Sequence, residues 1–176
     1  MEENDIDFYI EDGYIIKLNK PTSELIDHVN VLLTKRNFES QSGITSLAAV
    51  TYPTSWVYMR NYDRTTSNKF TKATKTAFVA ALTAWLTGAT GGAATLAKAA
   101  GAGFGGYYFI ESDVEDVYHH MRYSYRELGP GRFTDTGSFM GDYEIKKVDR
   151  ATKSSTDTGG DIVTRYYKST IIEPFY

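Results

Sequence analysis

The segment from Thr76 to Ile110 constrains the fold most, because small side chains dominate it and Lys98 is its only charged residue. It reads TAFVAALTAWLTGATGGAATLAKAAGAGFGGYYFI. Protein cores are built mainly from Leu, Ile, Val and Phe, which bury large apolar areas. Ala, Gly and Thr gain little from burial, but they let two backbones approach closely, as helices do in lipid or in tight hairpins. The segment therefore predicts either a close-packed helical hairpin or a membrane-active element.

Small residues recur every fourth position in both halves of this segment. Residues four apart lie on one helix face, so each half offers a smooth surface to another helix. Neither half alone reaches the roughly 20 apolar residues that cross a bilayer. The whole segment would be long enough as one helix, against a strain of about 1 kcal/mol for each central glycine. The predicted helix-packing positions are Ala80, Ala84, Gly88, Gly92, Ala97, Gly101 and Gly105.

Positive charge is concentrated directly before the small-residue segment. Residues 51–110 carry one acid and six bases, although the whole chain has a net charge of −3. A basic run beside an apolar run favours anionic membrane surfaces, and the alternative is the solvated first turn of a buried helix. The predicted membrane-binding set combines these bases with the large apolar residues that follow: Lys69, Lys72, Lys75, Phe78, Leu82, Trp85 and Leu86.

Composition excludes several classes of site. The absence of cysteine rules out disulfides, thiolate metal sites and cysteine nucleophiles. No G-x-S-x-G motif occurs, and we predict no catalytic residue, cofactor or enzymatic activity. Nucleic acid is a disfavoured partner, because the chain is acidic and its basic run adjoins apolar residues rather than stacking aromatics. The acidic start MEENDIDF lacks the apolar core of a signal peptide. The Ser-, Thr- and Tyr-rich second half favours a secreted mature form over a cytosolic protein.

The remaining pattern predicts a single α+β domain over residues 1–176. A β-hairpin with its turn at Asp12-Gly13 precedes an amphipathic helix over residues 22–36, whose apolar stripe includes Leu25, Val29 and Leu32. A helix from Ser67 or Asn68 to Thr87 and another over 93–101 form the hairpin, placed at 66–106. Strands are expected at 107–110, 117–126, 139–145 and 162–172, with turns at 128–131 and 152–160. The sheet should be mostly antiparallel.

An acidic and histidine-rich cluster invites a metal hypothesis. It contains Asp113, Glu115, Asp116, His119 and His120. Adjacent residues on a strand point to opposite faces, so the two histidines cannot easily share one ion. We therefore predict no metal, a core-facing His119 and a solvent-facing His120. A hydrolase with its site near His119 remains a weaker alternative.

In organisation, the chain resembles pore-forming toxins and the large unmodified bacteriocins that Gram-positive bacteria secrete. Lys69, Lys72 and Lys75, followed by AFVAALTAWLTGATGGAATLAKAAGAGFGG, carry this resemblance over about a fifth of the chain. It implies killing of related cells by membrane disruption, oligomerisation on the membrane and a cell-surface receptor recognised by the sheet. The alternative is an extracellular binding or surface protein that uses a Tyr-rich sheet, with a purely structural helical hairpin.

Overall fold

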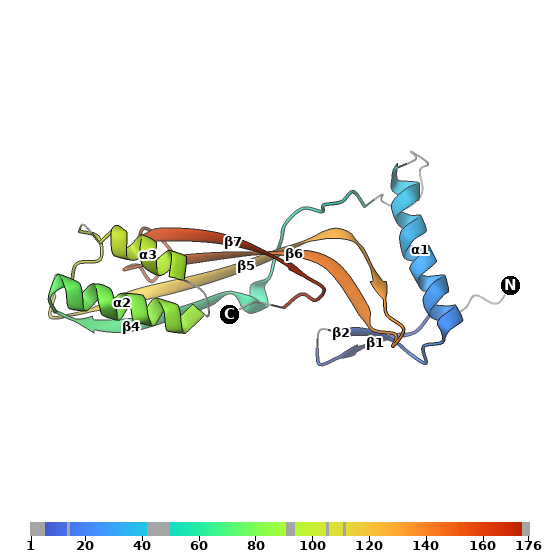
Figure 1. The fold of residues 1–176 in the computed structure, drawn as a ribbon, viewed down its shortest axis with the longest axis horizontal. Coiled ribbons are helices and arrows are strands. Elements are labelled where there is room, and N and C mark those ends of the chain that lie inside the picture. The colour runs from blue at the N-terminus through green and yellow to red at the C-terminus, as the bar shows by residue number, and fades with distance from the viewer. Residues whose placement is uncertain are drawn as a thin grey trace. The chain divides into compact units, whose positions relative to one another are not determined.

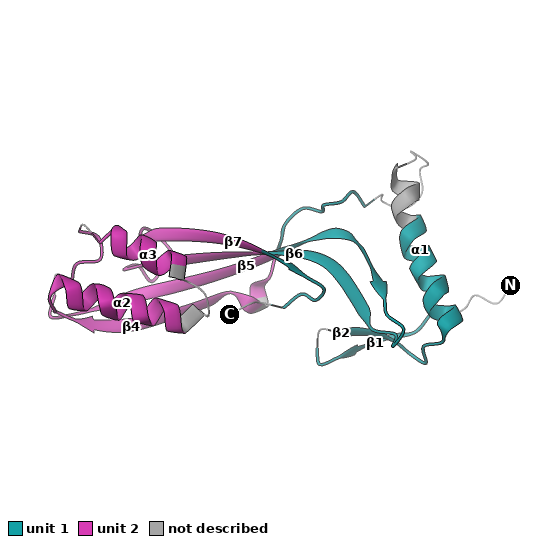
Figure 2. Cartoon of the chain, viewed as in Figure 1, with its two compact units in different colours: residues 1–57, 125–145, 167–173 teal, residues 58–124, 146–166, 174–176 magenta. Residues whose placement is uncertain are grey.

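The computed structural model describes residues 6–13, 15–41, 50–90, 94–104, 106–110 and 112–173. The fold is α+β, with helices and antiparallel sheets (Figure 1). The chain was expected to form one domain, and its contacts group it into two compact units (Figure 2). Unit 1 comprises residues 1–57, 125–145 and 167–173, and unit 2 comprises residues 58–124, 146–166 and 174–176.

Unit 1 begins with the predicted hairpin. Strands β1 (Phe8–Glu11) and β2 (Ile15–Leu18) pair antiparallel, and Asp12 and Gly13 take the positive φ angles of 52° and 80° that such a turn needs. Helix α1 (Ser23–Gln41) follows, and the Thr22 hydroxyl caps it by accepting the Leu25 amide at 3.2 Å.

A small apolar core holds α1 in unit 1. Ile26 and Val29 are buried with Leu18 and Phe133, whereas Leu32 of the predicted stripe is 43% exposed. The side-chain amide of Asn30 reinforces this contact, because it accepts the Phe133 amide at 2.7 Å and donates to the Phe133 carbonyl at 3.0 Å. These two bonds satisfy both backbone groups of a residue at a strand end.

Long strands supply the main sheet and contribute residues to both units. They are β5 (Val114–Phe133), β6 (Phe139–Thr152) and β7 (Asp161–Ser169), in the order β3-β5-β6-β7 with β3 at Val57–Tyr58. The turn expected at 128–131 is wrong, because β5 continues to Phe133 and the chain reverses at 134–138. Gly131 instead takes φ +66° within the strand, where a Cβ would lie 2.7 Å from the Met140 carbonyl oxygen.

In unit 2 the central helix begins later than the sequence predicts. Residues expected to begin a helix near Ser67 form β4 (Arg64–Thr71), which pairs antiparallel with β5. This stretch contains three threonines, and β-branched residues fit a pleated surface better than a helix. Helix α2 (Lys75–Thr90) begins only after Thr74, whose hydroxyl accepts the Ala77 amide at 3.3 Å.

Helices α2 and α3 (Ala94–Ala102) lie along strands β4 to β7 (Figure 1). Their core joins aromatic and aliphatic residues from both helices and the sheet, including Phe70, Phe78, Leu96, Phe104 and Val117. Residues 107–108 lie in a turn and residues 109–110 are irregular, instead of the expected strand.

Tyr108 attaches this segment to the sheet through its side chain. Its hydroxyl donates to the Ala151 carbonyl at 2.7 Å and accepts the Asp161 amide at 2.9 Å, so the side chain ties this segment to β6 and β7. Burial raises the pKa of the Tyr108 phenol.

Candidate functional site

The inner face of α2 uses the large apolar residues that were predicted to contact membrane. Phe78 is 4% exposed, Leu82 1% and Leu86 0%, and Trp85 packs against the same core. Phe70 contacts both Phe78 and Trp85 edge-on, with ring centroids 5.1 and 5.9 Å apart. In this state these four predicted membrane-binding residues hold α2 on the sheet.

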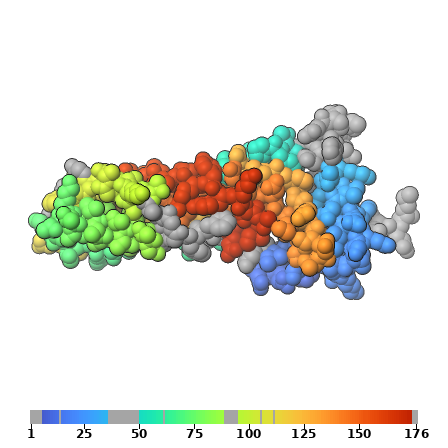
Figure 3. All heavy atoms as spheres, in the orientation of Figure 1, coloured from blue at the N-terminus to red at the C-terminus, as the bar shows by residue number. Residues whose placement is uncertain are grey.

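The outer face of α2 carries three of the predicted helix-packing residues. Ala80, Ala84 and Gly88 are exposed, and a Cβ built on Gly88 would meet no atom within 4 Å. Lys75, at the first position, is the only charged residue of α2. Figure 3 shows part of this helix on the molecular surface, in green. The exposed positions are Thr76, Ala77, Ala80, Ala81, Thr83, Ala84, Thr87 and Gly88.

The other predicted packing residues lie on or near α3. Ala97 is 2% exposed and belongs to the core. A Cβ on Gly101 would lie 3.7 Å from Cγ1 of Val79, so Gly101 faces α2 at ordinary contact distance. Gly92 and Gly105 lie outside the described residues.

The tertiary structure brings an acidic segment beside the basic run. Lys69 on β4 is the cross-strand partner of Asp116 on β5, and Phe70 is the partner of Glu115. Cross-strand neighbours of opposite charge attract, so the positive field expected from Lys69 is partly offset. Lys72 and Lys75 lie beyond the end of β4, and neither forms an ion pair with the described part of the chain.

A cluster of charged side chains is buried in unit 2 on the sheet face that α2 covers. We call His119, Lys147 and Asp149, together with Arg165, whose side chain is 20% exposed, the buried ionic cluster. Oδ1 of Asp149 lies 3.1 Å from Nε2 of His119 and 3.4 Å from Nζ of Lys147, and Oδ2 accepts from Arg165 at 2.6 Å. His119 and Asp149 are 0% exposed and Lys147 is 1% exposed. Trp85 of α2 meets the His119 ring edge-on at 6.3 Å.

The hydrogen bonding of this cluster is incomplete. Nδ1 of His119 and Nζ of Lys147 are buried without a hydrogen-bond partner among the described residues, although the ammonium lies 5.5 Å from the Tyr123 ring centroid. Burial lowers the pKa of Lys147 despite its attraction to Asp149. Burial alone would raise the pKa of Asp149, but hydrogen bonds from His119 and Arg165 outweigh it and hold this pKa below its ordinary value.

Sequence reasoning missed most of the buried ionic cluster. It placed His119 correctly toward the core but did not single out Lys147, Asp149 or Arg165. The signal was present, because the alternation through Ile145 continues to Lys147, Asp149 and Ala151, all four of which are buried. A lysine and an aspartate therefore occupy core positions of β6.

The expectation that His120 faces solvent is wrong. His120 points away from α2 but is only 7% exposed, because the loop after β6 folds over it. Its Nε2 lies 2.9 Å from the Ser154 carbonyl oxygen, and its Nδ1 lies 3.1 Å from the Thr65 hydroxyl. Asp157 of the same loop pairs with Arg150 at 2.9 Å and with Arg122 at 3.0 Å. These contacts fix the loop on the sheet.

The geometry does not support hydrolysis at His119. The imidazole is oriented by Asp149, as in a catalytic pair, but it is fully buried under Trp85. A catalytic base must come within hydrogen-bond reach of its substrate. Over the described ranges, no group of three or more His, Asp or Glu side chains is placed to hold a metal ion.

Two further results bear on function. No helix within the described ranges combines the length and apolar character needed to cross a membrane. Comparison with known proteins found no matching family model, curated protein or solved structure.

Proposed function

We propose that this chain is a secreted, non-enzymatic, membrane-active antibacterial protein that acts through α2 and α3. The observation that carries the proposal is the uncharged outer face of α2, which exposes only Ala, Thr and Gly from Thr76 to Gly88. A surface helix of a globular protein normally places charged and polar residues opposite its buried face. A helix without such residues on its outer face is suited to packing against a second partner on that face.

The spacing of the small residues indicates what covers this face. Ala80, Ala84 and Gly88 form one stripe, and such stripes let helices approach closely in lipid, where packing rather than water drives association. We propose that this stripe joins copies of the chain on a bacterial membrane, with a cell-surface receptor as a further partner. Nucleic acid and cofactors have no part in this function.

The buried ionic cluster would lower the free-energy cost of lifting α2 from the sheet. A helix that lies only on apolar side chains loses their full burial when it lifts. When α2 lifts, water would also reach His119 and Lys147, whose burial is unfavourable and incompletely compensated by hydrogen bonds. This gain offsets part of the apolar loss. In this proposal α1 is the amphipathic helix of unit 1, and α2 with α3 is the hairpin that moves.

Ala84→Leu is expected to reduce killing of Gram-positive indicator cells by roughly tenfold, which corresponds to about 1.4 kcal/mol of lost helix association. Ala84 is exposed, so the free energy of unfolding should change by less than about 0.5 kcal/mol. The matched control is Thr83→Leu, on the same helix but roughly 100° away from the stripe. Equal killing by all three proteins would remove the role of the stripe. Gly101→Leu is a poorer test, because Val79 already lies beside that position.

Release of a trapped dye tests the membrane step directly. The intact chain should release dye from vesicles that contain anionic lipid more than from neutral vesicles, and added salt should reduce the difference. Because Asp116 opposes Lys69, the salt effect is expected to come mainly from Lys72 and Lys75. Absence of release at every lipid composition and salt concentration would argue against the proposed function.

A second candidate function is an extracellular binding or surface protein with structural helices. The observation that favours it is the face of β7 that carries Ile162, 48% exposed, and Tyr166, 57% exposed. Tyr suits a half-wet contact surface. In this case Tyr166→Ala should reduce sedimentation with purified peptidoglycan sacculi by roughly tenfold, as expected for a loss of about 1.4 kcal/mol. Ala84→Leu should leave this sedimentation unchanged. Sedimentation that falls in Ala84→Leu but not in Tyr166→Ala would reject this candidate.

A further inference from the structure

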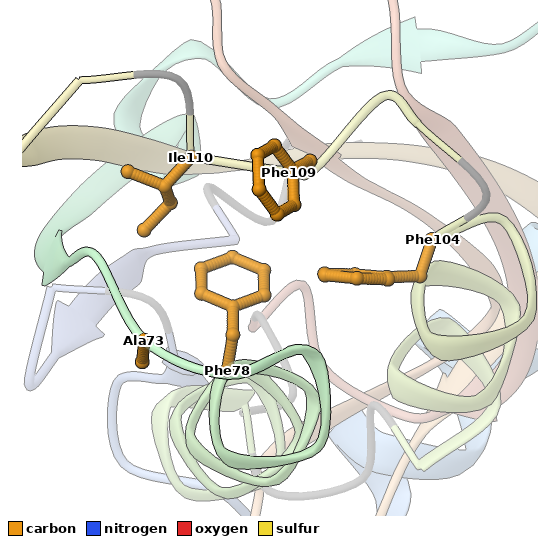
Figure 4. Close-up of a pocket in the computed structure, with 5 residues that line it drawn as sticks. All are labelled: Ala73, Phe78, Phe104, Phe109 and Ile110. Carbon is orange, nitrogen blue, oxygen red and sulfur yellow. The ribbon is translucent and has the colours of Figure 1, made fainter.

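An apolar pocket lies at the start of α2, where Lys72 precedes the lining residue Ala73 and Lys75 begins the helix. Ala73, Phe78, Phe104, Phe109 and Ile110 line this pocket (Figure 4). Phe78 occupies its centre, and Phe104, Phe109 and Ile110 lie around it. Phe78, Phe104 and Ile110 are buried, whereas Phe109 is 44% exposed. The pocket therefore presents one aromatic ring to solvent over an apolar floor.

Lysines lie close in space or in sequence to the residues that line this pocket. Nζ of Lys75 lies 5.4 Å from the Phe104 ring centroid, and the Lys72 amide donates to the Asp113 carbonyl at 3.0 Å. Lys153 donates to the Phe109 carbonyl at 2.6 Å and pairs with Glu115 at 3.1 Å. Glu115 is thereby compensated, and Asp113 is the remaining exposed acid described beside Lys72.

We infer that this end of unit 2 is the surface that docks on an anionic phospholipid bilayer, with Phe109 as its apolar anchor and Lys72 and Lys75 as its headgroup contacts. The inference rests on the proposed function and names the residues that make the first contact. Aromatic side chains favour the membrane interface, and lysines can place their stems along apolar surface while the ammonium meets phosphate. Docking here leaves Leu82 and Leu86 in the core, so it requires no movement of α2.

Hydrogen bonds between side chains and the backbone hold the segment that carries Phe109 in place. Lys153 holds the Phe109 carbonyl, and the preceding Tyr108 is anchored to Ala151 and Asp161. An anchor that is already ordered loses less conformational freedom on binding than a mobile loop does. The ring can enter the interface without rearrangement of the fold.

The test is co-sedimentation of the full chain with vesicles of phosphatidylglycerol and phosphatidylcholine, compared with phosphatidylcholine alone. Phe109→Ser should weaken binding to the anionic vesicles about tenfold, and Phe109→Trp should preserve it. Lys72→Gln and Lys75→Gln should each weaken it roughly fivefold and reduce the dependence on salt. The matched control is Val57→Ser, which removes an apolar side chain of similar exposure, 46%, from unit 1.

The outcomes separate this inference from the proposed function. Three results would overturn the inference: binding of Phe109→Ser equal to wild type, an equal loss of binding in Val57→Ser, or no binding of the wild type. Dye release is measured on the same samples. Release that persists in Phe109→Ser would retain the proposed function without this docking surface. Phe109-dependent binding without release would retain the surface and reject the function.

Discussion

Asp149→Asn is expected to lower the free energy of unfolding by about 3–5 kcal/mol, because it removes the only carboxylate of the buried ionic cluster. Lys147 would then keep a buried positive charge without its carboxylate partner, and Arg165, whose side chain is 20% exposed, would lose its ion pair with Asp149. Asparagine keeps nearly the same size, so the loss would reflect charge rather than a cavity. Urea denaturation at pH 7 measures it, and a change below about 1 kcal/mol would show that the carboxylate stabilises little.

Two further variants test whether the loss of stability in Asp149→Asn comes from a buried, unpaired charge. Asp157→Asn removes an ion-paired carboxylate that is partly exposed, so it should cost no more than about 1 kcal/mol. The double variant Lys147→Met with Asp149→Asn removes both charges of one buried pair, and it should lose less than Asp149→Asn alone. A purely additive loss would mean that the two residues do not interact.

Asp149 should also make the free energy of unfolding depend on pH. In the folded chain the pKa of Asp149 lies below its ordinary value, so its stabilisation is fully present above about pH 4. This stabilisation is lost as the pH falls through the folded pKa, where the carboxylate takes up a proton. The stability difference between wild type and Asp149→Asn should therefore narrow in acid. A difference that stays constant down to pH 2 would contradict this account.

Leu86→Ala is expected to lower the free energy of unfolding by about 2–5 kcal/mol, because Leu86 is fully buried between α2 and the sheet. Leu82→Ala should behave alike. Val114→Ala is the control, since Val114 is 52% exposed and should change stability by less than about 0.5 kcal/mol. Chemical denaturation of the three variants measures the effect.

The stability of Leu86→Ala decides what a loss of killing by this variant means. If Leu86→Ala abolishes killing together with folding, the loss says nothing about membrane contact. If Leu86→Ala leaves stability unchanged, α2 is not held on the sheet as the structure shows, and the energetic argument for its release is wrong. Ala84→Leu avoids this ambiguity, because Ala84 contributes little to the core.

Local chemistry alone determined several elements. The Asp12-Gly13 turn was predictable because few residues accept positive φ, and both do so here. The alternation of Val117, His119, Met121 and Tyr123 placed these residues on one face, and all four are buried. The small-residue composition of 76–110 predicted two helices. The stripe of Ala80, Ala84 and Gly88 follows from helix geometry, although its role in association remains a prediction.

Only the tertiary structure decided the remaining features, because they depend on partners distant in sequence. Pairing with β5 made Arg64–Thr71 a strand and set Asp116 opposite Lys69. A helix packed over β6 turned Lys147 and Asp149 into core residues, and the loop after β6 buried His120. Periodicity states which residues share a face, whereas burial depends on what covers that face. The sequence thus determined the helices and faces, and long-range contacts decided which charges are buried.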